Sequence, residues 1–159
     1  MNIFKASELL KIAVQIEKNG LAFFNEIKGK VRSFTAQETF DSLAKQELEH
    51  QKAFEGMLQK VGDYQPAESY SGEYAMYLEA LAGENIFTKD EGIKNIAKGL
   101  NSDSEAIQIG IGFEKDSIIF YNDMKKFVPS QDQGTVDRII EEEKKHLAKL
   151  VQLKKEVKS

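Results

Sequence analysis

The chain has 159 residues, of which 41% are hydrophobic and 30% charged, the balance expected of one soluble globular domain with its own core. Its net charge of −4 is spread along the sequence without a basic run, so we expect neither a nucleic-acid partner nor a membrane anchor. The chain has no cysteine, which excludes disulfides, thiolate metal sites and thiol nucleophiles and leaves Glu, Asp and His as metal ligands.

The first twenty residues, "MNIFKASELLKIAVQIEKNG", are interrupted by charged residues that include Lys5, Glu8, Lys11 and Glu17. They therefore lack the continuous apolar segment of a signal peptide. No other run approaches the roughly 18 apolar residues that a membrane span requires. From these features we expect a soluble protein of the cytoplasm, with no membrane partner.

Apolar periodicity predicts four long helices, over residues 6–28, 36–60, 103–127 and 131–157. A capping box of the form Ser/Thr-x-x-Glu/Gln marks the start of each of the last three helices. The boxes are "TAQE" (35–38), "SDSE" (102–105) and "SQDQ" (130–133). Short loops join the first helix to the second and the third to the fourth. Each of these pairs should therefore form an antiparallel hairpin.

The connection between the two hairpins, residues 61–102, is too long for a simple loop. It predicts short helices of its own near "EYAMYLEAL" and after the capping box "TKDE". We expect this crossover to bring the third helix back antiparallel to the second. Two hairpins joined by one long crossover predict an all-α fold: a ferritin-like antiparallel four-helix bundle that forms a single domain over residues 1–159.

An internal repeat relates the two hairpins. "AVQIEKNGLAFFNEI" (13–27) aligns with "GIGFEKDSIIFYNDM" (110–124), and "QELEHQKAF" aligns with "EEEKKHLAKL". The first alignment has an offset of 97 residues and the second an offset of 96, and the difference falls in the hairpin loops. Each half thus carries one Glu on its first helix and a Glu-x-x-His on its second. The paired residues are Glu17 with Glu114, Glu47 with Glu143, and His50 with His146.

These six residues interrupt the apolar stripes of their helices near mid-length, where antiparallel packing brings them to one depth of the core. Four ionised carboxylates there would repel one another and lose their hydration, and cations resolve that conflict. Two divalent ions would offset the four negative charges, and neutral imidazoles would complete the sites. The sequence therefore predicts a centre for two metal ions bound by Glu17, Glu47, His50, Glu114, Glu143 and His146. A bundle that kept the fold and lost the metal is the alternative.

This ligand pattern resembles the ferritin-like superfamily, and "YLEALAGENIF" (77–87) with "FEKDSIIFY" (113–121) resembles the rubrerythrin family, over about residues 5–157. The resemblance implies two iron ions, with manganese or a mixed pair as alternatives. It also implies a non-haem di-iron oxidoreductase that reduces hydrogen peroxide or dioxygen with electrons from a separate donor protein. A ferroxidase or iron-handling protein, and a non-catalytic metal-binding module, are the alternative functions.

The chain departs from rubrerythrins that carry a rubredoxin module, because it has no Cys-x-x-Cys pair. Rubrerythrins also carry a further carboxylate on the third long helix, where this chain has Gly110, Ile111, Ser117 and Ile118 around Glu114. The set of six ligands resembles that of bacterioferritins. However, the sequence ends without a fifth helix similar to that of the cage-forming ferritins. With the apolar Phe4, Ile86 and Phe87 as candidate contacts, we expect a homodimer and not a storage cage.

Some residues near the ligands allow two interpretations. Tyr121 is either a core aromatic residue or a phenol that donates a hydrogen bond, or takes part in redox chemistry, beside the metals. Gly20 and Ser117 either leave room for a small oxidant or allow close helix packing. We expect the flanking carboxylates Glu49, Glu141 and Glu142 to face solvent. We expect six phenylalanines to lie in the core: Phe23, Phe24, Phe34, Phe40, Phe54 and Phe113.

Overall fold

The computed structural model describes residues 5–64, 72–84 and 90–157, in which every regular element is a helix. In chain order the elements are α1 (Ala6–Lys28), α2 (Phe34–Val61), α3 (Gly72–Glu84), α4 (Asp90–Lys98), α5 (Asp103–Met124), the 3₁₀ helix η1 (Lys125–Phe127) and α6 (Ser130–Glu156). The predicted all-α fold is confirmed, and η1 completes the segment predicted as the third long helix. None of the described helices is long and apolar enough to cross a membrane.

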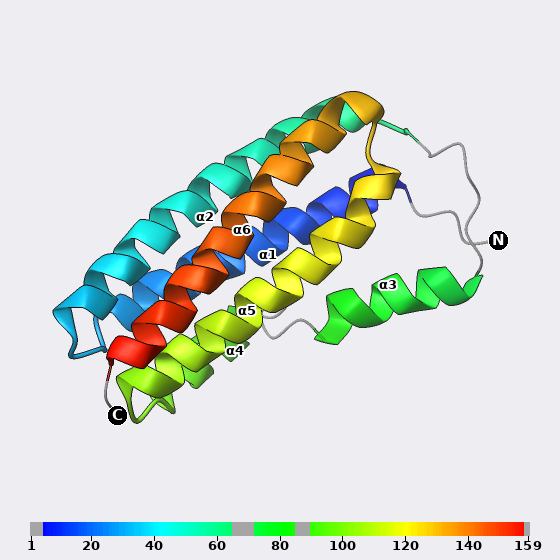
Figure 1. The fold of residues 1–159 in the computed structure, drawn as a ribbon. Helices are drawn as coiled ribbons and strands as arrows, with labels where there is room; N and C mark the ends of the chain where they lie inside the picture. Colours follow the sequence, from blue (N-terminus) through cyan, green and yellow to red (C-terminus); the bar gives the residue numbers. More distant parts are fainter. Residues whose placement is uncertain (1–4, 65–71, 85–89, 158–159) are drawn as a thin grey trace.

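The four long helices form a bundle of two hairpins, α1 with α2 and α5 with α6, in which α1 lies beside α5 and α2 beside α6 (Figure 1). Helices α2 and α5 begin at the same end of the bundle. There, Asp103 in the first turn of α5 accepts hydrogen bonds from the backbone N–H groups of Arg32 and Ser33, just before α2. Helix α5 therefore runs parallel to α2, and the prediction of an antiparallel return is wrong. Since the crossover runs back along the bundle, each long helix is instead antiparallel to both of its neighbours.

Of the three capping boxes assigned to the long helices, one caps its helix as predicted. Ser102 is the N-cap of α5, and its Oγ accepts the backbone N–H of the residue three positions later at 3.1 Å. Helix α2 begins two residues earlier than predicted, with Ser33 and not Thr35 as its N-cap. Helix α6 includes Ser130 as its first residue, so the prediction of Ser130 as its cap is also wrong.

The two hairpin loops are closed in the same way. The side-chain amide of Gln37, in the first turn of α2, donates to the backbone carbonyl of Val31 at 2.9 Å. Gln133, its counterpart in α6, donates to the carbonyl of Val128 at 3.3 Å. The internal repeat thus extends beyond the metal-ligand pattern to the contacts that turn each hairpin.

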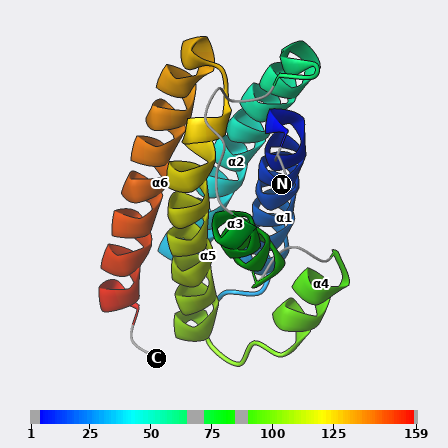
Figure 2. The ribbon, with the colours of Figure 1, turned by 90° about the vertical axis from the view of Figure 1, so that its right-hand side faces the viewer.

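The crossover contains two short helices, as predicted, and they lie on the α1–α5 side of the bundle (Figure 2). Helix α3 packs on α5 and α4 packs on α1, with Leu78 and Ile93 among their buried side chains. The "TKDE" box begins outside the described residues. Phe4, Ile86 and Phe87 also lie outside them, so the homodimer stays a prediction.

The apolar stripes of the long helices meet in one core. Of the six phenylalanines assigned to it, five are completely buried: Phe23, Phe24, Phe40, Phe54 and Phe113. Phe34 is 70% exposed, which contradicts its assignment. It is the first residue of α2 and precedes the stripe that begins at Ala36 and Phe40, so its side chain is not carried into the core.

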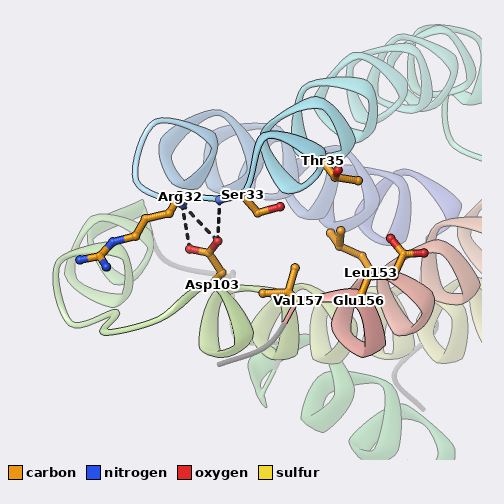
Figure 3. Close-up of a pocket in the computed structure, with 7 residues that line it drawn as sticks. All are labelled: Arg32, Ser33, Thr35, Asp103, Leu153, Glu156 and Val157. Carbon is orange, nitrogen blue, oxygen red and sulfur yellow. Dashed lines mark hydrogen bonds between the residues drawn. The ribbon is translucent and has the colours of Figure 1, made fainter.

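The contact of Asp103 with the loop before α2 ties the two hairpins together at one end of the bundle (Figure 3). We expect Asp103→Ala to lower the free energy of unfolding by about 1–2 kcal/mol, because two backbone N–H groups lose a charged acceptor. Urea denaturation followed by circular dichroism measures this change. Asp63→Ala, at a side chain that is 97% exposed, is the matched control and should change stability by less than about 0.5 kcal/mol. Equal midpoints for the two variants would show that the tie contributes nothing.

Candidate metal centre

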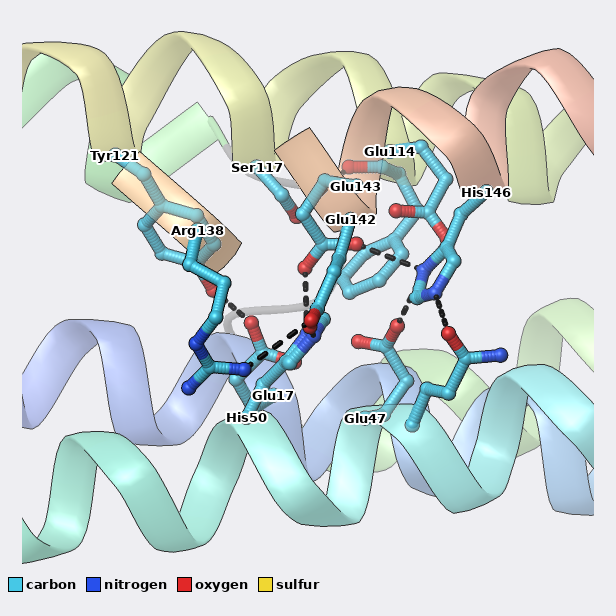
Figure 4. A network of polar contacts seen from close by, with 12 residues as sticks. Glu17, Glu47, His50, Glu114, Ser117, Tyr121, Arg138, Glu142, Glu143 and His146 are labelled. Carbon is cyan, nitrogen blue, oxygen red and sulfur yellow. Dashed lines mark hydrogen bonds and ion pairs between the residues drawn. The ribbon is translucent and has the colours of Figure 1, made fainter. Parts of the chain in front are cut away.

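The four long helices bring all six predicted ligands together at mid-length (Figure 4). The Glu-x-x-His spacing places both side chains of each pair on one helix face, since residues three apart lie one above the other. Each of the six side chains is buried, with at most 3% of its surface exposed. Their sources are α1 for Glu17, α2 for Glu47 and His50, α5 for Glu114, and α6 for Glu143 and His146.

The ligands form two overlapping sets. In each set, one nitrogen or oxygen atom per residue lies within 4.8 Å of the corresponding atoms of the others. Glu47 and Glu143 belong to both sets, which is the arrangement expected of carboxylates shared between two ions. The set we name position 1 is Glu17, Glu47, His50 and Glu143, and the set we name position 2 is Glu47, Glu114, Glu143 and His146.

Several carboxylate oxygens in this cluster have no hydrogen-bond partner among the described residues. They are both oxygens of Glu47, both oxygens of Glu114, and Oε2 of Glu17 and of Glu143. Four of these oxygens, one from each glutamate, lie near Nδ1 of His50 or His146, at 2.9 to 3.6 Å, but only as ion-pair contacts. Buried polar atoms are nearly always hydrogen-bonded, and buried charges are paired or bind metals. The residues therefore fit two cations. Oxygen-rich sets with one imidazole each suit iron or manganese.

Glu143 lies between the two imidazole rings. Its Oε1 is 3.1 Å from Nδ1 of His50, and its Oε2 is 2.9 Å from Nδ1 of His146. The rings are nearly parallel, at an interplanar angle of 17°, with their centroids 5.6 Å apart. Both histidines thus direct Nδ1 toward the four clustered glutamates, and Nε2 points out of the cluster.

Without metal, the carboxylates differ in proton affinity. Burial and the negative charge of Glu143 raise the pKa of Glu47 and of Glu114 well above the usual range. Burial alone would also raise the pKa of Glu143, but close contacts with the two histidines lower it instead. For His50, burial disfavours the charged form, yet close contacts with Glu143 and Glu17 raise its pKa to about 11. The metal-free cluster is thus held by protons on some carboxylates and by charged contacts of Glu143.

Tyr121 contacts a ligand directly. Its hydroxyl donates a hydrogen bond of 2.5 Å to Oε1 of Glu17, and its ring is completely buried. Burial and the neighbouring Glu17 raise the pKa of Tyr121 well above its usual value, so the phenol keeps its proton at neutral pH. Tyr121 is thus both a core aromatic residue with its hydroxyl hydrogen-bonded and a donor to a predicted metal ligand.

The residues that contact Nε2 of each histidine were not predicted from the sequence. Nε2 of His50 lies 2.6 Å from the carboxylate of Glu142, which also accepts from Arg138 at 3.1 Å. Nε2 of His146 lies 2.8 Å from the side-chain oxygen of Gln46. Glu142 was expected to face solvent, but it is only 31% exposed and this expectation is wrong.

A signal for these partners was present in the sequence. Gln46 and Glu142 each precede the Glu of a Glu-x-x-His pair, at equivalent positions of the repeat. Polar residues at both positions could have indicated a shared role. The other two flanking carboxylates, Glu49 and Glu141, are exposed as expected.

The small residues one turn from the ligands allow close packing. A Cβ atom on Gly20 would lie 2.4 Å from the ring of Phe113 and 2.9 Å from Oε2 of Glu47. Phe113 thus fills the space beside Gly20, which favours the packing interpretation over room for an oxidant. Ser117 is completely buried and donates its hydroxyl to the backbone carbonyl of Phe113 at 3.0 Å.

We expect Gly20→Ala to lower the free energy of unfolding by about 1–3 kcal/mol, because the added methyl must displace Phe113 and the shared ligand Glu47. Urea denaturation of the metal-free protein measures the change. Gly56→Ala is the control, since a Cβ there would meet no atom within 4 Å, and it should raise stability by up to about 1 kcal/mol. If both variants were stabilised, the close contact at Gly20 would not constrain the site.

The stability of the metal-free protein should depend on pH. Between about pH 5 and 9 the metal-free protein should lose stability as pH rises, because groups with a raised folded-state pKa stabilise the fold only while they hold their protons. Glu47, Glu114 and His50 all act in this direction, whereas Glu143, with a lowered pKa, titrates below this window.

Thermal unfolding of chelator-treated protein at several pH values tests this expectation. Replacing Glu47 and Glu114 together by Gln should flatten the profile, since the amides keep the neutral state of the protonated acids. A melting temperature of the unaltered chain that rose steadily from pH 5 to pH 9 would contradict the assignment.

Comparison with known proteins agrees with this centre. No curated protein matches the chain. A solved structure from Thermotoga maritima, described as that of a ferritin-like diiron-carboxylate protein, is similar to it with 29% identity, a TM-score of 0.74 and coverage of 98% of both chains. The family model for rubrerythrin matches residues 8–154. Because that match covers nearly the whole chain, including all six predicted ligands, the protein belongs to the rubrerythrin family.

Proposed function

We propose that the protein is a non-haem di-iron oxidoreductase that reduces hydrogen peroxide, or dioxygen, with electrons from a separate donor protein. The observation that carries the proposal is the buried cluster of four carboxylates and two imidazoles, in which most of the carboxylate oxygens accept no hydrogen bond from the described residues. Membership of the rubrerythrin family and similarity to a structure described as a diiron-carboxylate protein support iron as the metal.

Glu17 and His50 would hold one ion and Glu114 and His146 the other, with Glu47 and Glu143 shared. Two ferrous ions would supply the two electrons that, together with two protons, convert hydrogen peroxide into two water molecules. A separate donor must then return those electrons. We propose a separate donor because this chain has no cysteine for a rubredoxin-type centre of its own.

The protein side chains orient the ligands and keep the centre dry. Tyr121 fixes the carboxylate of Glu17 through a hydrogen bond and holds its own proton there. Phe54 packs against Tyr121 with ring centroids 5.0 Å apart, and Phe113 packs beside Glu47 over Gly20. These aromatic side chains exclude bulk water from the carboxylates, which strengthens their electrostatic interactions.

The proposal is tested by loading the metal-free protein with ferrous iron without oxygen and mixing it with hydrogen peroxide or with dioxygen in a stopped-flow instrument. We expect oxidation by stoichiometric peroxide to be the faster reaction, and turnover to depend on an added electron donor. Even with a large ferrous excess in air, the chain should retain only about two irons.

Retention of dozens of irons as soluble mineral, with slow oxidation by peroxide, would favour a ferroxidase. Binding of one zinc ion without uptake of iron would favour the non-catalytic metal-binding module. Either result would overturn the proposed activity.

Removal of a ligand should abolish tight binding and leave the helices intact. We expect Glu47→Ala to weaken iron binding by more than about 100-fold. Removing a residue that only hydrogen-bonds to a ligand weakens metal binding by about 10–100-fold, and the loss of a ligand shared by both ions should cost more. Equilibrium dialysis measures the binding, and circular dichroism checks the helices. Glu49→Ala is the control, since Glu49 is exposed and pairs with Lys52. Full occupancy in Glu47→Ala would refute the ligand assignment.

A further inference from the structure

The ligands of the two positions are related by the repeat, but the residues behind them are not. Position 1 uses Glu17 and His50 where position 2 uses Glu114 and His146, and both positions share Glu47 and Glu143. The ligand types are therefore the same at the two positions. A difference between the two bound ions must come from the groups that hold these ligands in place.

The partners of the histidines differ in charge. His50, in position 1, meets the carboxylate of Glu142 at 2.6 Å, and Arg138 holds that carboxylate from the other side. His146, in position 2, meets the neutral amide of Gln46 at 2.8 Å. The repeat equivalent of Arg138 is Ser42, which lies 3.3 Å from the Gln46 amide nitrogen and has no charge.

The partners of the unshared glutamates differ as well. Glu17, in position 1, accepts a 2.5 Å hydrogen bond from Tyr121. At the equivalent place beside position 2 the chain has Phe24, which is buried and has no hydroxyl. Neither oxygen of Glu114 has a hydrogen-bond partner in the described part of the chain.

Both differences favour the same position. A carboxylate behind a metal-bound histidine fixes the ring and makes its nitrogen a stronger ligand than an amide does. A ligand already held in place loses less conformational freedom on binding than a ligand that is not. The ligands of position 1 are thus held on both sides. Glu114 of position 2 has, beyond its packing, only a 3.4 Å contact with Nδ1 of His146, which is itself a predicted ligand, and no partner equivalent to Tyr121.

We propose that the two positions are unequal: position 1 fills first and retains its ion, and position 2 fills second and exchanges its ion more readily. Glu142 and Tyr121 are the positioning residues for this difference. The inference rests on the metal centre of the proposed function, but not on the reaction that the centre performs.

Titration of the metal-free protein with cobalt(II), followed by its visible absorption, tests the inference without any turnover. The unaltered chain should bind two ions in two resolved steps. Glu142→Gln should weaken the first step by about 10–100-fold, the usual cost of losing such a partner, and should bring the two steps together. Tyr121→Phe should weaken the same step. Gln46→Glu should tighten the second step by about tenfold.

Glu141→Gln is the matched control, because Glu141 undergoes the same substitution one residue away but pairs with Lys144 at the surface. It should leave both steps unchanged. The melting temperatures of the metal-free variants separate a positioning effect from a structural one, since Glu142→Gln should weaken binding even where the apoprotein is equally stable.

The possible results distinguish this inference from the proposed function. Two equal steps in the unaltered chain, or equal weakening of both steps by Glu142→Gln, would overturn the inequality and leave the di-iron proposal standing. Failure to bind cobalt or iron at all would overturn both. Weakening of the first step alone, with the second step tightened by Gln46→Glu, is the expected result.

Discussion

The structure depends on one electrostatic constraint, the placing of four carboxylates in a buried layer of an apolar core. Two like charges 4 Å apart repel by about 4 kcal/mol even at an effective dielectric constant of 20, and desolvation adds to that cost. Such a layer is tolerated only if protons, imidazoles or cations offset its charge. In the metal-free state, Glu47 and Glu114 favour their protonated forms while Glu143 faces both histidines. The packing around the layer must then keep these groups from moving apart.

The topology meets this requirement because every long helix is antiparallel to both of its neighbours. Ligands at mid-length on four helices therefore meet at one depth, and equivalent glutamines close the two loops that set the register of each hairpin. Asp103 fixes the end of one hairpin against the other. The fold and the candidate metal centre are thus consequences of the same geometry.

The sequence was sufficient to predict the four long helices, the two short helices of the crossover, and the gathering of four glutamates and two histidines inside the bundle. It was sufficient because a Glu or His in an apolar stripe has no other ready explanation. Sequence alone did not predict the role of Glu142, since this residue lies beside the stripe and its partner His50 comes from another helix. Phe34 was misassigned for a similar reason: its apolar side chain gives no sign that the helix begins there. The direction of α5 depends on the path of the crossover, which periodicity does not specify.

The covalent connection between the hairpins has a further consequence. One hairpin carries half of the ligands, so two separate copies could in principle assemble the same centre as a symmetric pair. In such a pair each substitution would alter both halves at once, and the two ions would have to be equivalent. Joining the halves in one chain gives them a high effective concentration for each other and removes that restriction. Glu142 and Gln46, at equivalent places in the repeat, differ in charge where a symmetric pair would carry the same residue twice.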